Sequence, residues 1–245
     1  MAGKTIIAFD LYGTLLSTES VAEELAKQYG EDTAKSLAAN WRRYQLEYTW
    51  RLNSMGTYRS FEAVTRASLH HALAEFELES TAQGESSLME SYNRLQVFPE
   101  VPEALDVIEK DQSIDACIFS NGTLSMIQAS VQSFSQSVFK KILTVEDVQV
   151  FKPDQRTYRH LLEQYGKEGQ PADVWLVSSN PFDVVGAVAA GLRAAWVDRA
   201  GKGWVDGLGD AIGDNIKPTL VAKGVDEAVK AIVAENSSSS KRDHK

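Results

Sequence analysis

The sequence is poor in cysteine and has no long apolar run. Its single cysteine, Cys117, excludes a disulfide within the chain, and the apolar residues around it favour burial of the thiol. No apolar run reaches the roughly 18 residues that a membrane-spanning helix needs. The first residues also lack the basic, apolar and small-residue order of a signal peptide. We therefore expect a cytoplasmic protein with no membrane partner.

Positive charge is scarce as well. The chain has 25 Lys and Arg against 34 Asp and Glu, which gives a formal net charge of -9 at pH 7. Nucleic acids bind surfaces rich in Lys and Arg, so no nucleic-acid partner is expected. The four histidines show no metal-ligand spacing. Acid–base chemistry is therefore expected to rest on carboxylates, and the cations that bind an anionic substrate must be local.

A short apolar strand near the start of the chain runs directly into an aspartate. Residues 5–9 read Thr-Ile-Ile-Ala-Phe, and Asp10 is followed by a turn signal at residues 12–14. In an open parallel α/β sheet, ligands bind beyond the carboxyl ends of the strands, so Asp10 would stand at the mouth of such a crevice. The alternative is that Asp10 only caps a turn, which is a common use of aspartate.

The next segment is helical throughout. Apolar spacing predicts helices over 20–29, 33–53, 60–75 and 80–95, with no strand between residues 17 and 97. A helical insertion after a first strand indicates a cap domain, 17–97, inserted into a core made of 1–16 and 98–235. Residues 236–245, four of them serines in a row, predict a disordered tail.

Strands and helices alternate after residue 98. The predicted strands are 115–120, 141–144, 174–177, 194–197 and 219–222. The predicted helices are 103–110, 124–131, 153–165 with Pro153 in its first turn, 183–190 and 225–235. The glycine-rich stretch 201–213 is expected to be loop. This alternation predicts an α/β fold with a Rossmann-like parallel sheet covered on both faces.

Polar groups follow four of these strands. Asp10 follows the first, Ser120 and Asn121 end another, Lys152 comes after the short strand 141–144, and Ser178 to Asp183 follow a fourth. Parallel strands would bring all four clusters to one edge of the sheet. Each cluster alone could be an ordinary turn or a solvated charge, but their coincidence at four strand ends favours a functional site.

These motifs, with the helical insertion after the first, resemble the haloacid dehalogenase superfamily over nearly the whole chain. In that superfamily the aspartate of the first motif is a nucleophile, and the Ser or Thr of the second motif and the Lys of the third bind the substrate anion. The matching residues here are Asp10 for the nucleophile and Ser120 and Lys152 for the anion-binding groups. Most members are magnesium phosphatases, with an acid two positions after the nucleophile and an acidic metal ligand at the start of the fourth motif. This chain has Tyr12 and Ser178 there, so the resemblance implies no metal, no cofactor and a leaving group such as halide.

The details are similar to the L-2-haloacid dehalogenase branch. The matching stretches are Asp10 to Thr14, Trp41-Arg42 with Gln45 to Trp50, Ser120 to Gly122, and Ser178 to Asn180 with Asp183. The resemblance implies hydrolysis of short L-2-haloalkanoic acids to D-2-hydroxy acids through an aspartyl ester. It also implies a homodimer, for which the stripe of Trp41, Tyr44, Tyr48 and Leu52 is the expected contact surface.

The resemblance also implies roles for individual residues. The expected catalytic set is Asp10, Thr14, Lys152, Ser178, Asn180 and Asp183, and the expected substrate-binding set is Leu11, Tyr12, Arg42, Ser120, Asn121, Tyr158 and Phe182. Arg42 would reach down from the cap, with Asn121 and an aromatic, to receive the halide. Phe182 stands where the branch would have tryptophan, and Tyr158 could equally be a packing residue.

Two other functions stay open at this point. One is a magnesium-dependent phosphatase of the same fold, and the other is a non-catalytic protein that binds small acids. The first would need a metal, and the second would bind a haloacid without releasing halide.

Overall fold

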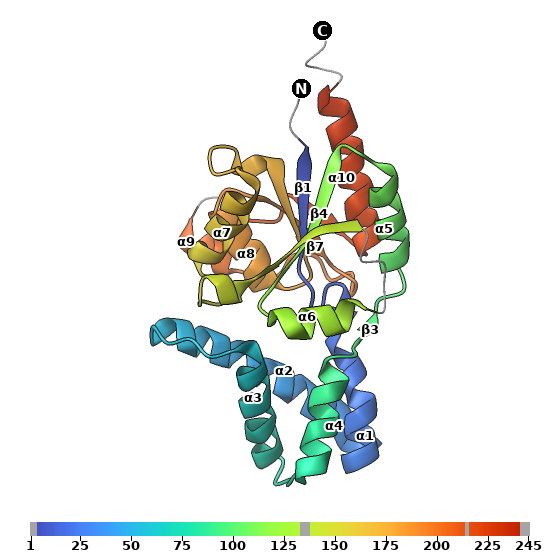
Figure 1. The fold of residues 1–245 in the computed structure, drawn as a ribbon, viewed down its shortest axis with the longest axis vertical. Helices are drawn as coiled ribbons and strands as arrows, with labels where there is room; N and C mark the ends of the chain where they lie inside the picture. The colour runs from blue at the N-terminus through green and yellow to red at the C-terminus, as the bar shows by residue number, and fades with distance from the viewer. Residues whose placement is uncertain (1–3, 133–137, 214–215, 241–245) are drawn as a thin grey trace.

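The structure is a computed structural model that describes residues 4–132, 138–213 and 216–240. Its centre is a six-stranded sheet in the order β5-β4-β1-β6-β7-β8, and every neighbouring pair is parallel. The strands are β1 (Thr5–Phe9), β4 (Ile114–Ser120), β5 (Phe139–Thr144), β6 (Val174–Ser178), β7 (Arg193–Val197) and β8 (Leu220–Ala222). The predicted α/β fold with a parallel sheet is confirmed (Figure 1).

Helices cover both faces of this sheet. Along β1, Ile7 and Phe9 pack with α5 (Val101–Lys110) and α10 (Val225–Ser240), while Ile6 and Ala8 pack with α7 (Gln155–Tyr165) and α8 (Pro181–Ala189). Successive residues of a strand point to opposite faces, so an apolar strand with no alternation is buried on both sides. Cys117 lies in the second layer and is buried, as predicted.

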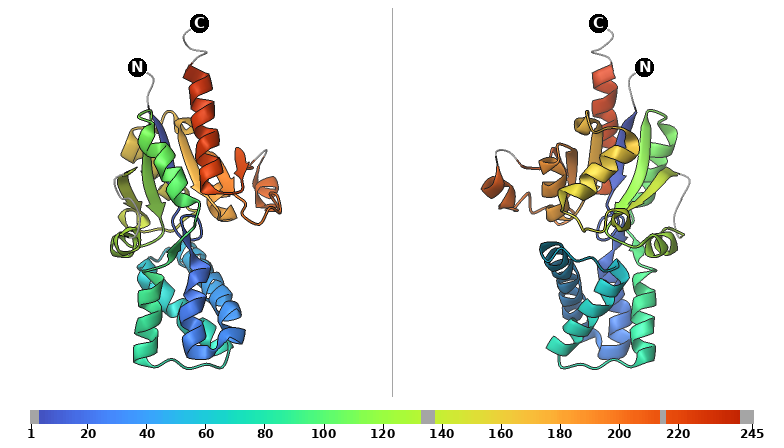
Figure 2. Two further views of the ribbon diagram at one scale, coloured as in Figure 1. Left: turned by 90° about the vertical axis from the view of Figure 1, so that its right-hand side faces the viewer. Right: turned by 60° about the vertical axis from the view of Figure 1, so that its left-hand side comes forward.

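Four α-helices between residues 22 and 92 lie together beyond the carboxyl edge of the sheet (Figures 1 and 2). These cap helices are α1 (Ala22–Tyr29), α2 (Glu31–Ser54), α3 (Phe61–Glu75) and α4 (Ala82–Tyr92). The chain enters and leaves them through a two-stranded antiparallel ribbon of β2 (Leu16–Ser17) and β3 (Gln96–Val97). The division into a core and a cap domain at this ribbon stays a prediction.

Some element predictions were wrong in detail. The ribbon β2–β3 places short strands at residue 17 and at 96–97, where none was expected. Helix α7 begins at Gln155 rather than at Pro153, because Asp154 is its N-cap and its carboxylate accepts the Arg156 N–H at 3.0 Å. A short helix, α9 (Leu208–Ile212), lies within the stretch expected to be loop.

The C-terminal helix is also longer than expected. It continues to Ser240, so residues 236–240 are helical rather than disordered. The hydroxyls of Ser237 and Ser238 donate to the carbonyls of Val233 and Ala234, which is a bond that serine forms readily within a helix. Residues 241–245 of the predicted tail lie outside the described residues.

The aromatic stripe of α2 is not an exposed patch. Trp41 and Tyr44 are buried, and the Trp41 indole N–H donates to the carbonyl of Thr65 on α3. Tyr48 and Leu52 are half-buried. Trp41 and Tyr44 therefore pack within the cap helices. The prediction that the stripe is an intersubunit surface was wrong for these two residues.

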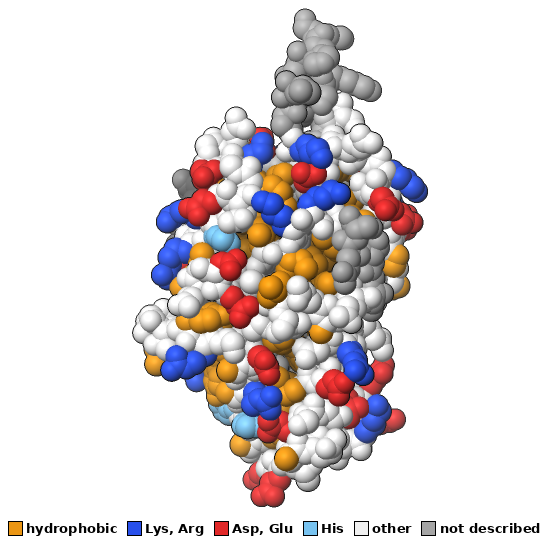
Figure 3. All heavy atoms as spheres, viewed as in Figure 1, with side chains coloured by type: hydrophobic (Ala, Val, Ile, Leu, Met, Phe, Trp, Pro, Cys, Tyr) orange, Lys and Arg blue, Asp and Glu red, His pale blue; other side chains and the backbone are white. Residues whose placement is uncertain are grey.

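Charged side chains of both signs are spread over the surface. On the face in Figure 3, Lys and Arg side chains alternate with Asp and Glu over both the core and the cap helices. None of the helices in the described part of the chain is long and apolar enough to cross a membrane.

Candidate active site

The carboxyl ends of three adjacent strands bring the predicted residues together. Asp10 follows β1, Ser120 ends β4 and Ser178 ends β6, and β4 and β6 flank β1 on its two sides. The Asp10 side chain is only 9% exposed. The cap helices lie beyond this edge of the sheet (Figure 2).

The Asp10 carboxylate is held through both oxygens. Oδ2 accepts hydrogen bonds from Asn180 Nδ2 at 2.7 Å, Thr14 Oγ1 at 2.9 Å and Ser178 Oγ at 3.5 Å. Within the part of the chain that the structure describes, Oδ1 accepts one, from Lys152 Nζ at 3.3 Å. One oxygen is thus saturated with donors, whereas the other has a single cationic partner and the freer lone pairs.

Lys152 is a buried cation between two carboxylates. Its ammonium group donates to Asp183 Oδ2 at 2.8 Å and to the carbonyl of Phe119 at 2.7 Å, and lies 4.1 Å from the centre of the Phe119 ring. The side chain is 1% exposed. Removing an ammonium group from water is costly, and these three partners with Asp10 offset that cost.

Asp183 is fully buried and binds a second side chain besides Lys152. Its Oδ1 accepts a hydrogen bond from the Tyr158 hydroxyl at 2.7 Å. Burial raises the pKa of the Asp183 carboxyl and the negative charge of Asp10 adds to this, while the positive charge of Lys152 opposes it. A raised pKa makes Asp183 a stronger base than an ordinary surface carboxylate.

Backbone and hydroxyl groups join the two loops that carry Asp10 and Asn180. Thr14 Oγ1 accepts the Ser179 N–H at 2.9 Å, and Ser179 Oγ donates to the carbonyl of Gly13 at 2.5 Å. Gly13 has φ +87°, a conformation that favours glycine and turns this carbonyl to its partner. Thr14 therefore orients Asp10 and also fixes the neighbouring loop.

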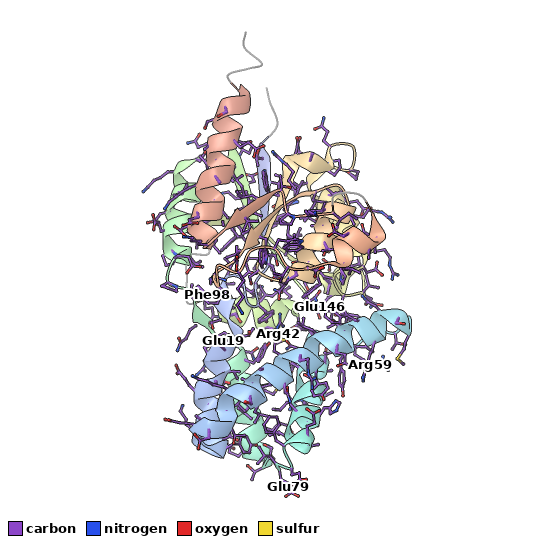
Figure 4. The ribbon with its side chains drawn as sticks, turned by 180° about the vertical axis from the view of Figure 1, so that it is seen from behind. Glu19, Arg42, Arg59, Glu79, Phe98 and Glu146 are labelled. Carbon is purple, nitrogen blue, oxygen red and sulfur yellow. The ribbon has the colours of Figure 1, made fainter. Side chains whose placement is uncertain are left out.

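Arg42 enters the site from the cap helices. Its Nη2 donates to the carbonyl of Tyr12 at 3.3 Å and to Asn180 Oδ1 at 3.4 Å. Figure 4 shows Arg42 on α2 where this helix passes the core. The Tyr12 ring is buried against Phe61 and Tyr92, with ring centres 5.5 and 5.7 Å away. Burial raises the pKa of Tyr12 far above its usual value, so its hydroxyl is a poor proton donor.

Comparison with known proteins places this site in a family. The model of a family described as haloacid dehalogenase-like hydrolases matches residues 4–191. The chain belongs to this family. It is 34% identical over 197 residues to an (S)-2-haloacid dehalogenase of Pseudomonas sp. strain YL, over 80% of this chain and 83% of that one.

Solved structures agree with this assignment. The L-2-haloacid dehalogenase of Xanthobacter autotrophicus is 29% identical and gives a TM-score of 0.82, over 94% of this chain and 98% of that one. The same enzyme with chloropropionic acid covalently bound is 28% identical and gives a TM-score of 0.80 over the same shares. The predicted membership of the haloacid dehalogenase family is confirmed.

Among family members, this chain has a donor set that does not fit a magnesium site. Magnesium prefers several oxygen ligands, chiefly carboxylates and water. Here Asp10 and Asp183 both bind the Lys152 ammonium, and a serine hydroxyl, Ser178, stands where magnesium-dependent members have an acid. The described residues contain no cluster of three or more His, Cys, Asp or Glu side chains that could hold a metal ion.

Three other predicted residues hydrogen-bond to the backbone or side chains of residues around the site. Asn121 Oδ1 accepts the Lys152 N–H at 2.9 Å, and Ser120 Oγ accepts the Gly122 N–H at 3.1 Å. In the described part of the chain no hydrogen bond joins Asn121 to Arg42; Arg42 bonds to Asn180 instead. Tyr158 contacts Asp183, so its hydroxyl positions that carboxylate.

Two further predicted residues are less directly connected. The Leu11 side chain is buried in the core, and its carbonyl accepts the N–H groups of Leu15 and Leu16 at 3.0 Å. Phe182 packs edge-on against Trp50 of α2, with ring centres 5.5 Å apart. Phe182 is thus part of the contact between the core and the cap helices.

Arg199 is a supporting residue that the sequence analysis missed. It donates to the carbonyls of Gly13 at 3.1 Å and Thr14 at 2.7 Å, is paired with Glu100 at 2.6 Å and lies over the Phe98 ring. Phe98 lies where the chain returns to the core (Figure 4). The sequence held a signal for Arg199, because this residue comes two positions after the end of β7, at the carboxyl edge of the sheet.

Asn53 of α2 was missed too, and no local signal marks it. Its Nδ2 donates to the carbonyl of Phe151 at 2.6 Å, and its Oδ1 accepts the Phe151 N–H at 2.9 Å. Phe151 immediately precedes Lys152. Helix α2 thus holds the backbone next to Lys152.

Proposed function

We propose that this protein is a hydrolase acting on carbon–halide bonds, which converts short L-2-haloalkanoic acids to D-2-hydroxy acids and halide. The observation that carries the proposal is the pairing of a buried carboxylate, Asp10, with a buried cation, Lys152, beside a residue that is not an acid, Tyr12. A halide ion leaves without a proton, unlike an alkoxide leaving group. The similar enzymes named as haloacid dehalogenases support the same reaction.

In the first proposed step, Asp10 Oδ1 attacks C2 of the haloacid from the side opposite the halogen. The new C–O bond forms as the carbon–halogen bond breaks, the bonding pair leaves with the halide, and the configuration at C2 inverts. Oδ1 is the oxygen that has a single hydrogen-bond partner among the described residues. Covalent catalysis divides a difficult displacement into two easier steps, here through an aspartyl ester.

In the second proposed step, water attacks the ester carbonyl carbon of Asp10. Asn180 would orient this water and Asp183 would accept its proton, for which its raised pKa is suited. The bond between the Asp10 carbonyl carbon and the substrate oxygen breaks, and the leaving alkoxide takes up the proton that Asp183 accepted from the water. The hydroxy acid keeps an oxygen from Asp10, and the Asp10 carboxylate re-forms with loss of the second water proton to solvent. The ammonium of Lys152 lies beside both carboxylates throughout.

The site must bind two negative charges, the carboxylate of the substrate and the halide that leaves. We assign the carboxylate to Ser120 and to backbone N–H groups after Asp10, including that of Leu11, which form an anion-binding turn. We assign the departing halide to Arg42, with Asn121 and Phe182 nearby as the resemblance implies. Phe182 is smaller than tryptophan and contacts Trp50, so the halide pocket would differ in shape from that of the branch.

The decisive experiment is halide release from L- and D-2-chloropropionate in buffer with EDTA. Chloride and D-lactate from the L isomer alone, lost in Asp10→Asn, are the expected result. p-Nitrophenyl phosphate with Mg²⁺ is run in parallel. Metal-dependent phosphate release without chloride would show a phosphatase, and binding without turnover of any substrate would show a small-acid binding protein.

The assembly and the compartment are further proposals. We propose that the protein is a homodimer and that it is located in the cytoplasm, as the sequence analysis leads us to expect. Light scattering of the purified protein tests the dimer, and fractionation of cells that express it tests the location. A monomer at micromolar concentration would contradict the first.

A further inference from the structure

A fully buried glutamine lies one helical turn from Arg42. Gln45 is on α2, and its side chain connects three of the cap helices. Its Oε1 accepts hydrogen bonds from Arg42 Nη1 at 2.6 Å and from the Tyr92 hydroxyl on α4 at 2.8 Å. Its Nε2 donates to Thr65 Oγ1 on α3 at 2.7 Å. All the polar atoms of this amide are therefore engaged.

The orientation of the amide follows from its partners. Thr65 Oγ1 gives its own proton to the carbonyl of Phe61, at 2.7 Å, so it can only accept from Gln45. Arginine has donors and no acceptor, so it needs the oxygen. Gln45 must turn its oxygen to Arg42 and its NH₂ group to Thr65, and the arrangement cannot flip without losing bonds on both sides.

Arg42 is held tightly on the cap side and loosely on the core side. Its bond to Gln45 is 2.6 Å long, whereas its bonds to the Tyr12 carbonyl and to Asn180 are 3.3 and 3.4 Å. Among the ion pairs of the described residues, none includes Arg42. A neutral oxygen therefore fixes the guanidinium without neutralising its charge.

We propose that Gln45 is a positioning residue that aims the Arg42 guanidinium into the site and keeps its charge available for the departing halide. This inference rests on the proposed dehalogenation. An acceptor is required to orient the guanidinium, and a neutral one is required because a buried carboxylate would cancel the charge that the halide needs. Glutamine meets both requirements.

The test replaces the amide with a carboxylate of the same shape. Gln45→Glu keeps an acceptor for Arg42 but cancels its charge. We expect inhibition by added bromide to weaken by about tenfold or more, the scale of a lost charge-assisted hydrogen bond. We also expect kcat to fall more for 2-chloropropionate than for 2-bromopropionate, because chloride is the poorer leaving group. A change in packing alone would leave both the bromide inhibition and this ratio as they are.

The matched control is Gln83→Glu, which adds the same charge at an exposed position of α4. It should leave both measurements unchanged. A folded Gln45→Glu that behaves like this control overturns the inference. If Gln45→Glu does not fold, Gln45→Met supplies the test: without an acceptor for Arg42 bromide inhibition should weaken, and unchanged inhibition overturns the proposal. A wild-type protein that releases no halide contradicts the proposed function itself, before any variant is compared.

Discussion

At the scale of single residues, the division of labour between the two carboxylates is set by their surroundings. Asp10 has 9% of its side chain exposed and four donors, whereas Asp183 has none exposed and is held by Lys152 and Tyr158. Burial raises the pKa of Asp183, which suits this carboxylate to the proposed role of a base. The other suits a nucleophile that must approach the substrate.

This division predicts the behaviour of Asp183→Asn. The first step needs only Asp10, whereas the second needs a base, so the variant should release halide once and then stop. Steady-state turnover should fall by about 10²- to 10⁴-fold, the usual contribution of a general base. Rapid-quench measurement should show a halide burst equal to the enzyme concentration, with the 2-carboxyalkyl group of the substrate found by mass spectrometry as an ester on the peptide that contains Asp10. Asp10→Asn is the control and should show no burst.

The raised pKa of Asp183 also predicts the pH dependence of turnover. Burial disfavours the ionised form, so protonation begins at a higher pH than for an ordinary aspartate, whose pKa is about 3.9. A protonated Asp183 cannot accept a proton from water, so kcat should fall as pH is lowered through this raised pKa. The halide burst does not use Asp183 as a base, so it should not follow this acid limb. Coincident acid limbs for burst and kcat would assign the limb to another group.

At the scale of elements, α2 is the part of the cap helices that completes the site. Arg42 reaches the Tyr12 carbonyl, Trp50 packs on Phe182, and Asn53 binds the backbone of Phe151. These contacts are distributed along one helix of 24 residues. Because a helix is stiff, a substitution that breaks one of these contacts should also shift the residues that make the others.

Asn53→Ala tests this connection. It removes two hydrogen bonds between α2 and the loop before Lys152, each worth about 0.5 to 1.5 kcal/mol. We expect a loss of stability of about 1 to 3 kcal/mol and faster hydrogen exchange at residues 150–152, because that backbone loses its partner on α2. Ser54→Ala, at the exposed neighbouring position, is the control and should leave both unchanged. Unaltered exchange at 150–152 in Asn53→Ala would show that the core alone holds this loop.

The comparison of sequence and structure separates two kinds of information. Asp10, Ser120 and Ser178 could be placed at one edge because a strand pattern and a polar end are both local signals. Asn53 and Phe151 are 98 residues apart, and neither belongs to a motif, so their contact depends on the packing of the cap helices on the core. The helical extension at 236–240 was missed for a related reason: serine has modest helix propensity, and its bonds to preceding carbonyls appear only once the helix has formed.

At the scale of the whole molecule, the site is buried between the core and α2. The side chains of Asp10, Lys152 and Asp183 are 9, 1 and 0% exposed, and Arg42 and Asn53 of α2 bind the loops that carry Asp10 and Lys152. In the proposed reaction a haloacid and a water molecule must both reach Asp10, and the hydroxy acid must leave. We therefore expect the contacts of α2 with the core to open during each turnover.

A reversible covalent lock between α2 and the core should stop this opening. Trp50 and Phe182 have ring centres 5.5 Å apart, and the natural Cys117 is buried with its pKa raised by burial to about 12, so it should not interfere. A direct disulfide needs Cα atoms within about 7 Å, so the two cysteines of Trp50→Cys/Phe182→Cys are bridged with a bis-methanethiosulfonate reagent, which spans a longer gap and is released by thiols. We expect the bridged protein to lose turnover by about tenfold or more, because substrate and product exchange would be gated by α2. Dithiothreitol should restore the rate of the unbridged double variant, and each single cysteine variant should keep its rate after treatment with the reagent. Full turnover by the cross-linked protein would mean that substrate enters by a route that leaves α2 in place.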